Sequence, residues 1–432
     1  MISPDAISKH IEEISKIGCI GVGPEYGYLR APWSKEESRA MDYFKKAGEE
    51  LGLTAKYDQV GNLFISTPDE KESVLQVGSH LDTVPAGGLY DGGAGIIAGF
   101  EAIKEVLNSN KSLKTSLELV IWRGEESATF NSLYMGSRAA FGVANPEFLK
   151  NSYNGQTLKE AISGAGFDPE FIKQSKPTLT EEKLAKVKAH IELHIEQATK
   201  LERDNLDIGI ITSIRAPKRY RIKIFGESAH SGATPMDLKY RKDAVLTASY
   251  INVRLNEAIL KEIKKGADLV QTVGVLNSDK DFNEKNTLIY DNAITKVSPF
   301  AYFYLDVRGN KKKELDAYTD CAKEIIEQTA TEFGTKVEIE LLSEADPVEE
   351  LCPSLQEKIS SASKSLDLGH TLMPSGAGHD AAVVARNSSI PTAMIFIPCR
   401  DGISHNPKEF TTPEAIAKGA NVIAEVFKSY QE

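Results

Sequence analysis

A histidine and several carboxylates lie close together in the first third of the sequence, among glycine-rich turns. His80, Asp82 and Asp91 fall within one stretch, Gly-Ser-His-Leu-Asp-Thr-Val-Pro-Ala-Gly-Gly-Leu-Tyr-Asp-Gly-Gly, and Glu125 and Glu126 follow a later apolar run. Imidazole and carboxylate groups are nitrogen and oxygen donors, which suit Zn²⁺, Mn²⁺ or Co²⁺ better than a soft metal or a purely oxygen-ligated cation. These residue types predict a metal site.

The segments around these residues predict a strand–loop–helix–strand unit. Residues 74–77 are a short apolar run, apolar residues recur at helical spacing after Gly93, and residues 116–122 are apolar again. Such a unit gives two parallel strands joined by a right-handed crossover. Because sites form where parallel strands end, we expect His80 and the Glu125–Glu126 pair to converge at one sheet edge.

Less specific explanations of these residues exist. A glycine-rich turn before a helix can bind phosphate, but residues 93–95 lack the G-x-G-x-x-G spacing, no Walker lysine follows, and the carboxylates would repel an anion. A single His-x-Asp is usually a capped turn, and a Glu-Glu pair is usually a solvated surface. Both follow apolar strands that end at the same edge, so a metal site is the better explanation.

Composition excludes several other classes of function. The chain has 432 residues and a net charge of −11, so it offers no basic surface to nucleic acid or to a membrane. No apolar run is long enough to span a bilayer, and the first residues lack the apolar core of a signal peptide. The four cysteines lie far apart without C-x-x-C spacing, which indicates neither a disulfide framework nor a thiolate site. We expect a cytoplasmic protein with two domains.

Two further segments place histidines at strand ends. Residues 187–195 alternate as a strand, in which His190, Glu192 and His194 share one face. A lone histidine such as His190 is more often structural, whereas His194 ends the strand, where a ligand belongs. His405 follows another predicted buried strand, in the loop Gly-Ile-Ser-His. Both His194 and His405 are therefore candidate ligands.

The order of predicted elements changes in the middle of the chain. Residues 219–342 give strand, helix, two strands, helix and strand, an order that resembles a ferredoxin-like domain. A polar turn in this segment, Gly-Glu-Ser-Ala-His-Ser-Gly-Ala-Thr-Pro-Met, contains His230. The predicted domains are residues 1–212 for the first part of the catalytic domain, 213–330 for an inserted domain and 331–432 for the rest of the catalytic domain.

A site can be assembled from these residues. Two metal ions need one bridging carboxylate and terminal ligands on each ion. Asp82 can accept the second N–H of a histidine ligand and fix its tautomer. Glu125 is then free to act as general base toward a metal-bound water, whose pKa is lowered to about 7. The five predicted ligands are His80, Asp91, Glu126, His194 and His405.

The motifs that contain these residues resemble those of a known family. They are Gly-Ser-His-Leu-Asp-Thr-Val-Pro, Tyr-Asp-Gly, Glu-Glu-Ser, Glu-Leu-His-Ile-Glu-Gln, Ala-His-Ser-Gly-Ala-Thr-Pro-Met, Pro-Ser-Gly-Ala-Gly-His-Asp-Ala and Gly-Ile-Ser-His, spread over residues 55–413. They look like the dinuclear zinc hydrolases of the aminoacylase and carboxypeptidase G type. His194, where related peptidases use an acid, is typical of the hydantoinase/carbamoylase amidases, which include N-carbamoyl-L-amino-acid hydrolase, β-ureidopropionase and allantoate amidohydrolase.

This resemblance implies an α/β fold of the zinc-exopeptidase type. The catalytic domain would hold a mixed, mainly parallel sheet flanked by helices, and the inserted ferredoxin-like α+β domain would act as a lid and form a homodimer. The resemblance also implies two divalent ions per subunit, Zn, Mn or Co, bound by the five ligands with Asp91 between them. Glu125 would be the base, and Asp82, as the partner of His80, is the other catalytic residue predicted in this domain.

The resemblance further implies a set of substrate contacts. Gln197 would contact the ureido group, and Arg308 would hold the substrate carboxylate with its guanidinium fork. His230, on the lid, would stabilise the oxyanion in a neighbouring subunit's site. Gly378 and His379 would line the pocket. The family's lid asparagine falls on Asn292 when a gap is allowed and on Thr295 when it is not.

The implied reaction hydrolyses the carbamoyl or ureido C–N bond of a small N-carbamoyl amino acid or related ureido acid, to an amine, CO₂ and ammonia. The alternative within enzymes is a dipeptidase or N-acyl-amino-acid hydrolase, against which His194 argues. The alternative outside enzymes is a binding module, against which Glu125 and the complete ligand set argue. Ser127 and Ala198 replace family glycines, and an unusual substrate stays open.

Overall fold

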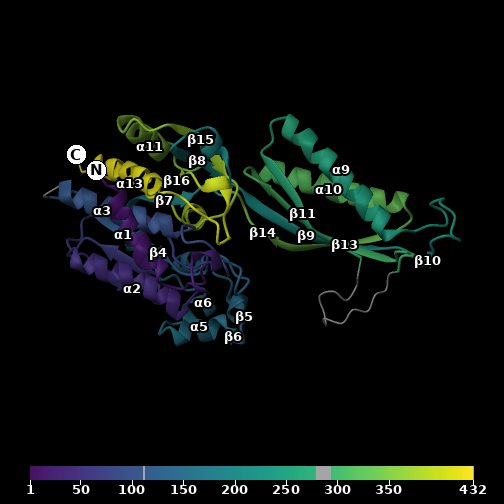
Figure 1. Ribbon diagram of the computed structural model, residues 1–432, viewed down its shortest axis with the longest axis horizontal. Coiled ribbons are helices and arrows are strands. Elements are labelled where there is room, and N and C mark those ends of the chain that lie inside the picture. Colours follow the sequence, from purple (N-terminus) through teal and green to yellow (C-terminus); the bar gives the residue numbers. More distant parts are fainter. Residues whose placement is uncertain (110–111, 279–292, 432) are drawn as a thin grey trace. The chain divides into compact units, whose positions relative to one another are not determined.

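The computed structural model describes residues 1–109, 112–278 and 293–431. The chain divides into two compact units (Figure 1): Met1–Thr212 with Glu350–Glu432, and Ser213–Glu349. The first unit is a large mixed sheet flanked by helices, so the predicted α/β fold class is confirmed. Among the described helices, none is both long and apolar enough to cross a membrane.

An eight-stranded sheet forms the centre of the first unit, in the order β1-β2-β4-β3-β7-β16-β8-β15. The four central strands, β4, β3, β7 and β16, run parallel, while β1, β2 and β8 pair antiparallel with their neighbours. The strands are β1 (Thr54–Tyr57), β2 (Leu63–Ser66), β3 (Val74–His80), β4 (Ser116–Trp122), β7 (Val187–Ile195), β8 (Ile208–Ile214), β15 (His370–Ser375) and β16 (Thr392–Ile397).

Helices cover both faces of this sheet, which is why β3, β4 and β16 are buried along their whole length. Side chains alternate between the faces: Leu117, Leu119 and Ile121 join the larger core, and Val120 and Trp122 join the other. The helices on the larger core are α1 (Pro4–Ser15), α2 (Lys35–Glu50), α3 (Gly93–Ser109), α11 (Pro353–Ser365) and α13 (Pro413–Lys428) (Figure 1). The helices α4 (Met135–Ala140) and α12 (Asp380–Asn387) pack on the other core.

Short elements connect these layers, and most lie between α4 and β7. They are η1 (Pro24–Tyr26), η2 (Pro146–Lys150), β5 (Ser152–Tyr153), β6 (Gln156–Thr157), α5 (Leu158–Gly164), α6 (Glu170–Lys173), α7 (Glu181–Lys186), α8 (Lys200–Arg203) and η3 (Arg400–Gly402).

The second unit is a four-stranded antiparallel sheet in the order β11-β13-β9-β14, with α9 and α10 packed on one face (Figure 1). Along the chain the order is β9-α9-β11-β13-α10-β14, the order of a ferredoxin-like fold. Its elements are β9 (Ala216–Phe225), β10 (Ala229–His230), α9 (Ala244–Lys264), β11 (Leu269–Asn277), β12 (Lys296–Val297), β13 (Phe300–Gly309), α10 (Lys312–Glu332) and β14 (Lys336–Glu344).

The second unit is longer than the inserted domain of residues 213–330 that we expected. It extends to Glu349 because β14 pairs with β9 from Lys336 to Glu344, and a further bridge joins Ile214 to Val348. Strand β14 therefore belongs to this sheet rather than to the catalytic one.

Candidate metal centre and active site

The five predicted ligands come together at the carboxyl edge of the parallel strands. His80 is the last residue of β3, His194 is the last but one of β7, and Glu126 and His405 lie in the loops after β4 and β16. Asp91 lies in the loop between β3 and α3. Each comes from a different strand or loop, so the sheet topology brings them together.

Asp91 lies at the centre of this cluster. Its Oδ1 is 2.9 Å from Nε2 of His194 and 3.3 Å from Nε2 of His80. Its Oδ2 is 3.4 Å from Nε2 of His405, which lies 3.3 Å from Oε1 of Glu126. The donor atoms thus form two groups, each within 4.8 Å, that share Asp91. A carboxylate shared in this way can bridge two ions.

Hydrogen bonds turn the histidine ligands toward this centre. The Nδ1 atoms of His80 and His194 donate to backbone carbonyl oxygens, of Asp82 at 3.1 Å and of Ile195 at 2.9 Å. The lone pair of each ring is then on Nε2, which faces Asp91. Fixing the tautomer in this way is the usual support of a metal-binding histidine.

The cluster holds more negative charge than the described cationic side chains offset. Asp91, Glu125 and Glu126 are buried, and none of the described lysines or arginines forms an ion pair with them. Burial raises the pKa of Glu126, and burial together with neighbouring carboxylates raises the pKa of Glu125 well above its usual range. Hydrogen bonds to Asp91 and Glu126 raise the pKa of His405 to about 10. A divalent cation would offset this charge, so these residues fit a metal.

Asp82 has a role that the sequence did not indicate. Its carboxylate accepts the backbone N–H groups of Glu125 at 3.2 Å and Glu126 at 2.9 Å. The carboxylate contact to His80 Nδ1 that we expected is longer, at 3.4 Å, because the backbone carbonyl oxygen of Asp82 is the nearer acceptor. Asp82 thus fixes the loop after β3, in which it lies, to the loop after β4, which contains Glu125 and Glu126.

Replacing Asp82 with asparagine should weaken metal binding by about 10–100-fold, the usual effect of losing an outer support of a metal site. An asparagine amide at this place would point N–H groups at the N–H groups of Glu125 or Glu126. Competition with a chromogenic chelator measures the affinity, and Asp69→Asn, at an exposed position, is the matched control. Unchanged affinity in Asp82→Asn would contradict this role.

Gln197 and Ser404 hold the other oxygen of Asp91. Nε2 of Gln197 donates to Asp91 Oδ2 and to Ser404 Oγ, both at 3.0 Å, and Ser404 donates to the same Oδ2 at 2.7 Å. The Oε1 atom of Gln197 is buried and has no hydrogen-bond partner among the described residues. An unpaired buried acceptor of this kind is available to a ligand that donates an N–H.

Glu409 is a supporting residue that sequence analysis missed. Its Oε1 accepts the backbone N–H groups of Tyr90 at 2.8 Å and Asp91 at 2.9 Å, and the residue is buried. In the sequence it stands in Asn-Pro-Lys-Glu-Phe, a composition typical of an exposed loop. Only its position four residues after His405 could have indicated a link to the site.

The predicted pocket residues lie beside the cluster. The buried ring of His379 is 4.5 Å from the ring of His194, and burial holds the pKa of His379 well below its usual range. Gly378 precedes it.

His190, which we considered structural, bonds through Nδ1 to Oε1 of Gln76 at 2.7 Å, and burial lowers its pKa to about 3.

Three predicted contacts belong to the second unit, which is described by itself. His230 is exposed, and its Nδ1 accepts the N–H groups of Gly232 and Ala233, so the neutral ring has its proton on Nε2. Arg308 donates from Nε and Nη2 to the carboxylate of Asp306, at 3.2 and 3.1 Å. Asn292 lies outside the described residues. Its alternative, Thr295, is described, and its backbone carbonyl oxygen accepts the N–H of Ser231. The roles of His230, of Arg308 and of Asn292 or its alternative Thr295 stay predictions.

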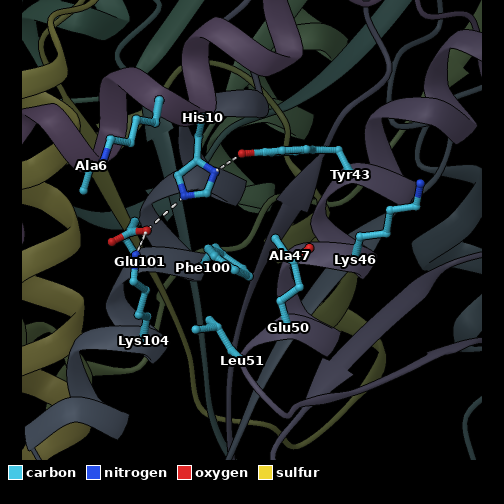
Figure 2. A pocket seen from close by; sticks show the side chains of 11 residues that line it. Ala6, His10, Tyr43, Lys46, Ala47, Glu50, Leu51, Phe100, Glu101 and Lys104 are labelled. Atoms are coloured by element: carbon cyan, nitrogen blue, oxygen red, sulfur yellow. Dashed lines mark hydrogen bonds and ion pairs between the residues drawn. The ribbon is translucent and has the colours of Figure 1, made fainter.

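A second polar cluster lies away from this centre, in a hollow of about 400 Å³ between α1, α2 and α3. Figure 2 shows the ring of His10 between Tyr43 and Glu101, with bonds of 2.6 Å to the hydroxyl and 2.9 Å to the carboxylate. Lys104 donates to the same carboxylate at 2.8 Å, and Phe44 stacks on the His10 ring. These groups satisfy one another, so we interpret this cluster as structural.

Replacing His10 with phenylalanine should keep the ring packing but leave the hydroxyl of Tyr43 without a partner and remove one of the two donors to the carboxylate of Glu101. The expected loss is about 1–3 kcal/mol of unfolding free energy. Urea unfolding followed by tryptophan fluorescence measures it, because both tryptophans, Trp33 and Trp122, lie in the first unit. Lys9→Ala, on the exposed rim, is the control, and equal stability of the two variants would refute the interpretation.

The fold and the cluster together define a class, that of α/β proteins with a candidate metal centre at the carboxyl edge of a mixed sheet. The chain belongs to peptidase family M20/M25/M40, whose sequence profile matches residues 77–429.

Within this family, several relatives match nearly the whole chain. N-carbamoyl-L-amino acid amidohydrolase of Geobacillus stearothermophilus is 33% identical over 418 residues, 95% of each chain. Allantoate amidohydrolase of Escherichia coli K12 is 31% identical, over 96% of this chain and 95% of that one. The crystal structure of a hydantoinase/carbamoylase family amidase from Burkholderia multivorans has a TM-score of 0.85 and 28% identity, over 100% of this chain and 98% of that one.

These similarities confirm the predicted relationship to the hydantoinase/carbamoylase amidases. They also confirm the prediction of an enzyme, a hydrolase of C–N bonds other than peptide bonds.

Proposed function

We propose that this chain is a metal-dependent amidohydrolase that cleaves the carbamoyl or ureido C–N bond of an N-carbamoyl amino acid or a related ureido acid. The observation that carries this proposal is the pair of donor groups sharing Asp91, with Glu125 buried beside them. Relatives named N-carbamoyl-L-amino acid amidohydrolase and allantoate amidohydrolase support the substrate class.

The five ligands would hold two divalent ions, of zinc, manganese or cobalt, with Asp91 between them. When bound, such ions polarise a carbonyl and lower the pKa of a water to about 7. The donor set is made of nitrogen and oxygen atoms, which is what these metals prefer. Ser404 and Gln197 hold Oδ2 of Asp91 and keep its orientation.

Glu125 is the proposed general base. It accepts a proton from the water that attacks the carbamoyl carbon and delivers it to the leaving nitrogen, so that amine, CO₂ and ammonia result. Burial and the neighbouring carboxylates raise the pKa of Glu125, which favours the protonated state between the two transfers, and Asp82 fixes its backbone. Gln197 uses its unpaired Oε1 to accept an N–H of the ureido group.

The second unit would complete the site. Arg308 would bind the substrate carboxylate, His230 would donate from Nε2 to the oxyanion, and Asn292 or Thr295 would contact the substrate. In support, the proton of the neutral His230 ring is on Nε2. The guanidinium of Arg308 binds the carboxylate of Asp306 through two N–H groups, and contact of this kind with a carboxylate supports the proposed role.

A homodimer through the second unit is part of this proposal, and so is a cytoplasmic location. On α9 of this unit, Tyr250, Val253 and Leu260 expose apolar side chains, as a subunit interface requires. Sedimentation equilibrium should give twice the mass of one chain.

All four cysteines are free, which fits a reducing compartment.

The test is a panel of N-carbamoyl-L-amino acids, N-carbamoyl-β-alanine, allantoate and dipeptides. Ammonia release reports on the ureido acids, and freed amines report separately on the dipeptides. We expect ammonia from at least one ureido acid and no dipeptide cleavage. Dipeptide cleavage alone would make the chain a dipeptidase, the alternative that the family name itself includes.

A further inference from the structure

Tyr134 is held beside the predicted base by an unusual backbone. Its φ is 56°, in the left-handed region that a bulky residue rarely adopts. Three hydrogen bonds fix this segment to the loop of Glu125: the N–H of Tyr134 donates to the carbonyl of Glu125 at 3.0 Å, and those of Met135 and Gly136 donate to Gly124 and Arg123 at 2.9 and 2.8 Å, respectively. Backbone strain of this kind is often retained at functional sites.

The side chain of Tyr134 reaches the other wall of the site. A Cβ atom on Gly378 would lie 2.1 Å from the Tyr134 hydroxyl, so only glycine fits beneath it. Gly378 adjoins His379, whose ring is 4.5 Å from that of His194. The phenol therefore extends from the loop of the predicted base to the loop that borders the ligand cluster.

The hydroxyl at this position has no protein partner. No described residue hydrogen-bonds to it, and Tyr134 is partly exposed. The guanidinium of Arg138 lies 5.6 Å from the ring centre and helps to fix the ring. Burial, with the charges of Glu125 and Asp380, raises the pKa of Tyr134, so the phenol keeps its proton and can donate.

We infer that Tyr134 is a specificity-determining residue whose hydroxyl hydrogen-bonds a polar side group of the substrate. This inference rests on the proposed function and deepens it: the substrate class becomes ureido acids with a small polar substituent. An apolar substituent at this place would leave the hydroxyl without a partner after excluding water from it, which is the basis of strong discrimination between isosteric substrates.

The test compares two isosteric substrates, N-carbamoyl-L-threonine and N-carbamoyl-L-valine, in the wild type and in Tyr134→Phe. We expect the wild type to prefer the threonine derivative in kcat/KM, and Tyr134→Phe to lose that preference by at least about tenfold. Tyr153→Phe, in β5 of the same unit, is the matched control. An unchanged preference, or an equal loss for both substrates, would overturn the inference.

A second experiment tests the contact itself and separates it from folding. Gly378→Ala should lower ammonia release because the new methyl group strikes the hydroxyl, and Tyr134→Phe should restore much of it in the double variant. No restoration would contradict the geometry. Metal content and melting temperature should be the same in Tyr134→Phe as in the wild type.

Binding distinguishes failure of this inference from failure of the proposed function. If the wild type released no ammonia from any ureido acid, the proposed function would fall. The role of Tyr134 would then be tested by binding. Calorimetric titration would compare the affinities of Glu125→Gln and Glu125→Gln/Tyr134→Phe for N-carbamoyl-L-threonine and N-carbamoyl-L-valine. Preference for the threonine derivative only when Tyr134 is present would support the inference, and equal binding or none would overturn it.

Discussion

Replacing Glu125 with glutamine should lower the rate of ammonia release by about 10²–10⁴-fold, the range expected for loss of a general base. Glutamine keeps the shape of glutamate but cannot accept a proton from the attacking water. Metal content should not change, because Glu125 belongs to neither donor group. Steady-state rates and elemental analysis of the same preparation measure the two quantities.

Glu182→Gln is the matched control for this variant, because its side chain is 81% exposed and lies on α7. It should have the rate and the metal content of the wild type. If Glu125→Gln retained a rate within about tenfold of the wild type, below the range for a general base, another group would have to take the proton.

Replacing Asp91 with alanine should abolish metal binding altogether, because both donor groups depend on this carboxylate. His405→Ala should be milder, because it removes a ligand from one group and leaves His80, Asp91 and His194 in place. Elemental analysis after dialysis should give background metal for the first variant and about half the wild-type content for the second. A full complement of metal in Asp91→Ala would refute a shared site.

The main features of the fold and of the donor set could be predicted from the sequence because they depend on local patterns. The apolar runs that became β3 and β4, and the residues directly after them, place His80 and Glu126 at one edge without knowledge of distant contacts. The alternation of residues 187–195 predicts a strand with His190 and His194 on one face. The position of His194 at the strand end then distinguishes it from His190, which the structure buries against Gln76.

The remaining features depend on contacts between distant segments. Glu409 meets the backbone of Asp91 only because two loops adjoin in the folded chain. Tyr134 gains its position from a left-handed backbone that no residue type signals. The pairing of β14 with β9 is a long-range contact of the same kind, because two helices and four strands lie between them in the chain. Asp82 was predicted near the site, but its bonds to two backbone N–H groups were not.

The most direct test of the central claim is ammonia release by metal-stripped protein, measured on the best ureido acid of the panel before and after reloading with Mn²⁺, Co²⁺ or Zn²⁺. A metal-dependent amidohydrolase should be inactive when stripped and should recover as ions are added, reaching its maximum when both donor groups are filled. Release of ammonia at the full rate by stripped protein would contradict the account.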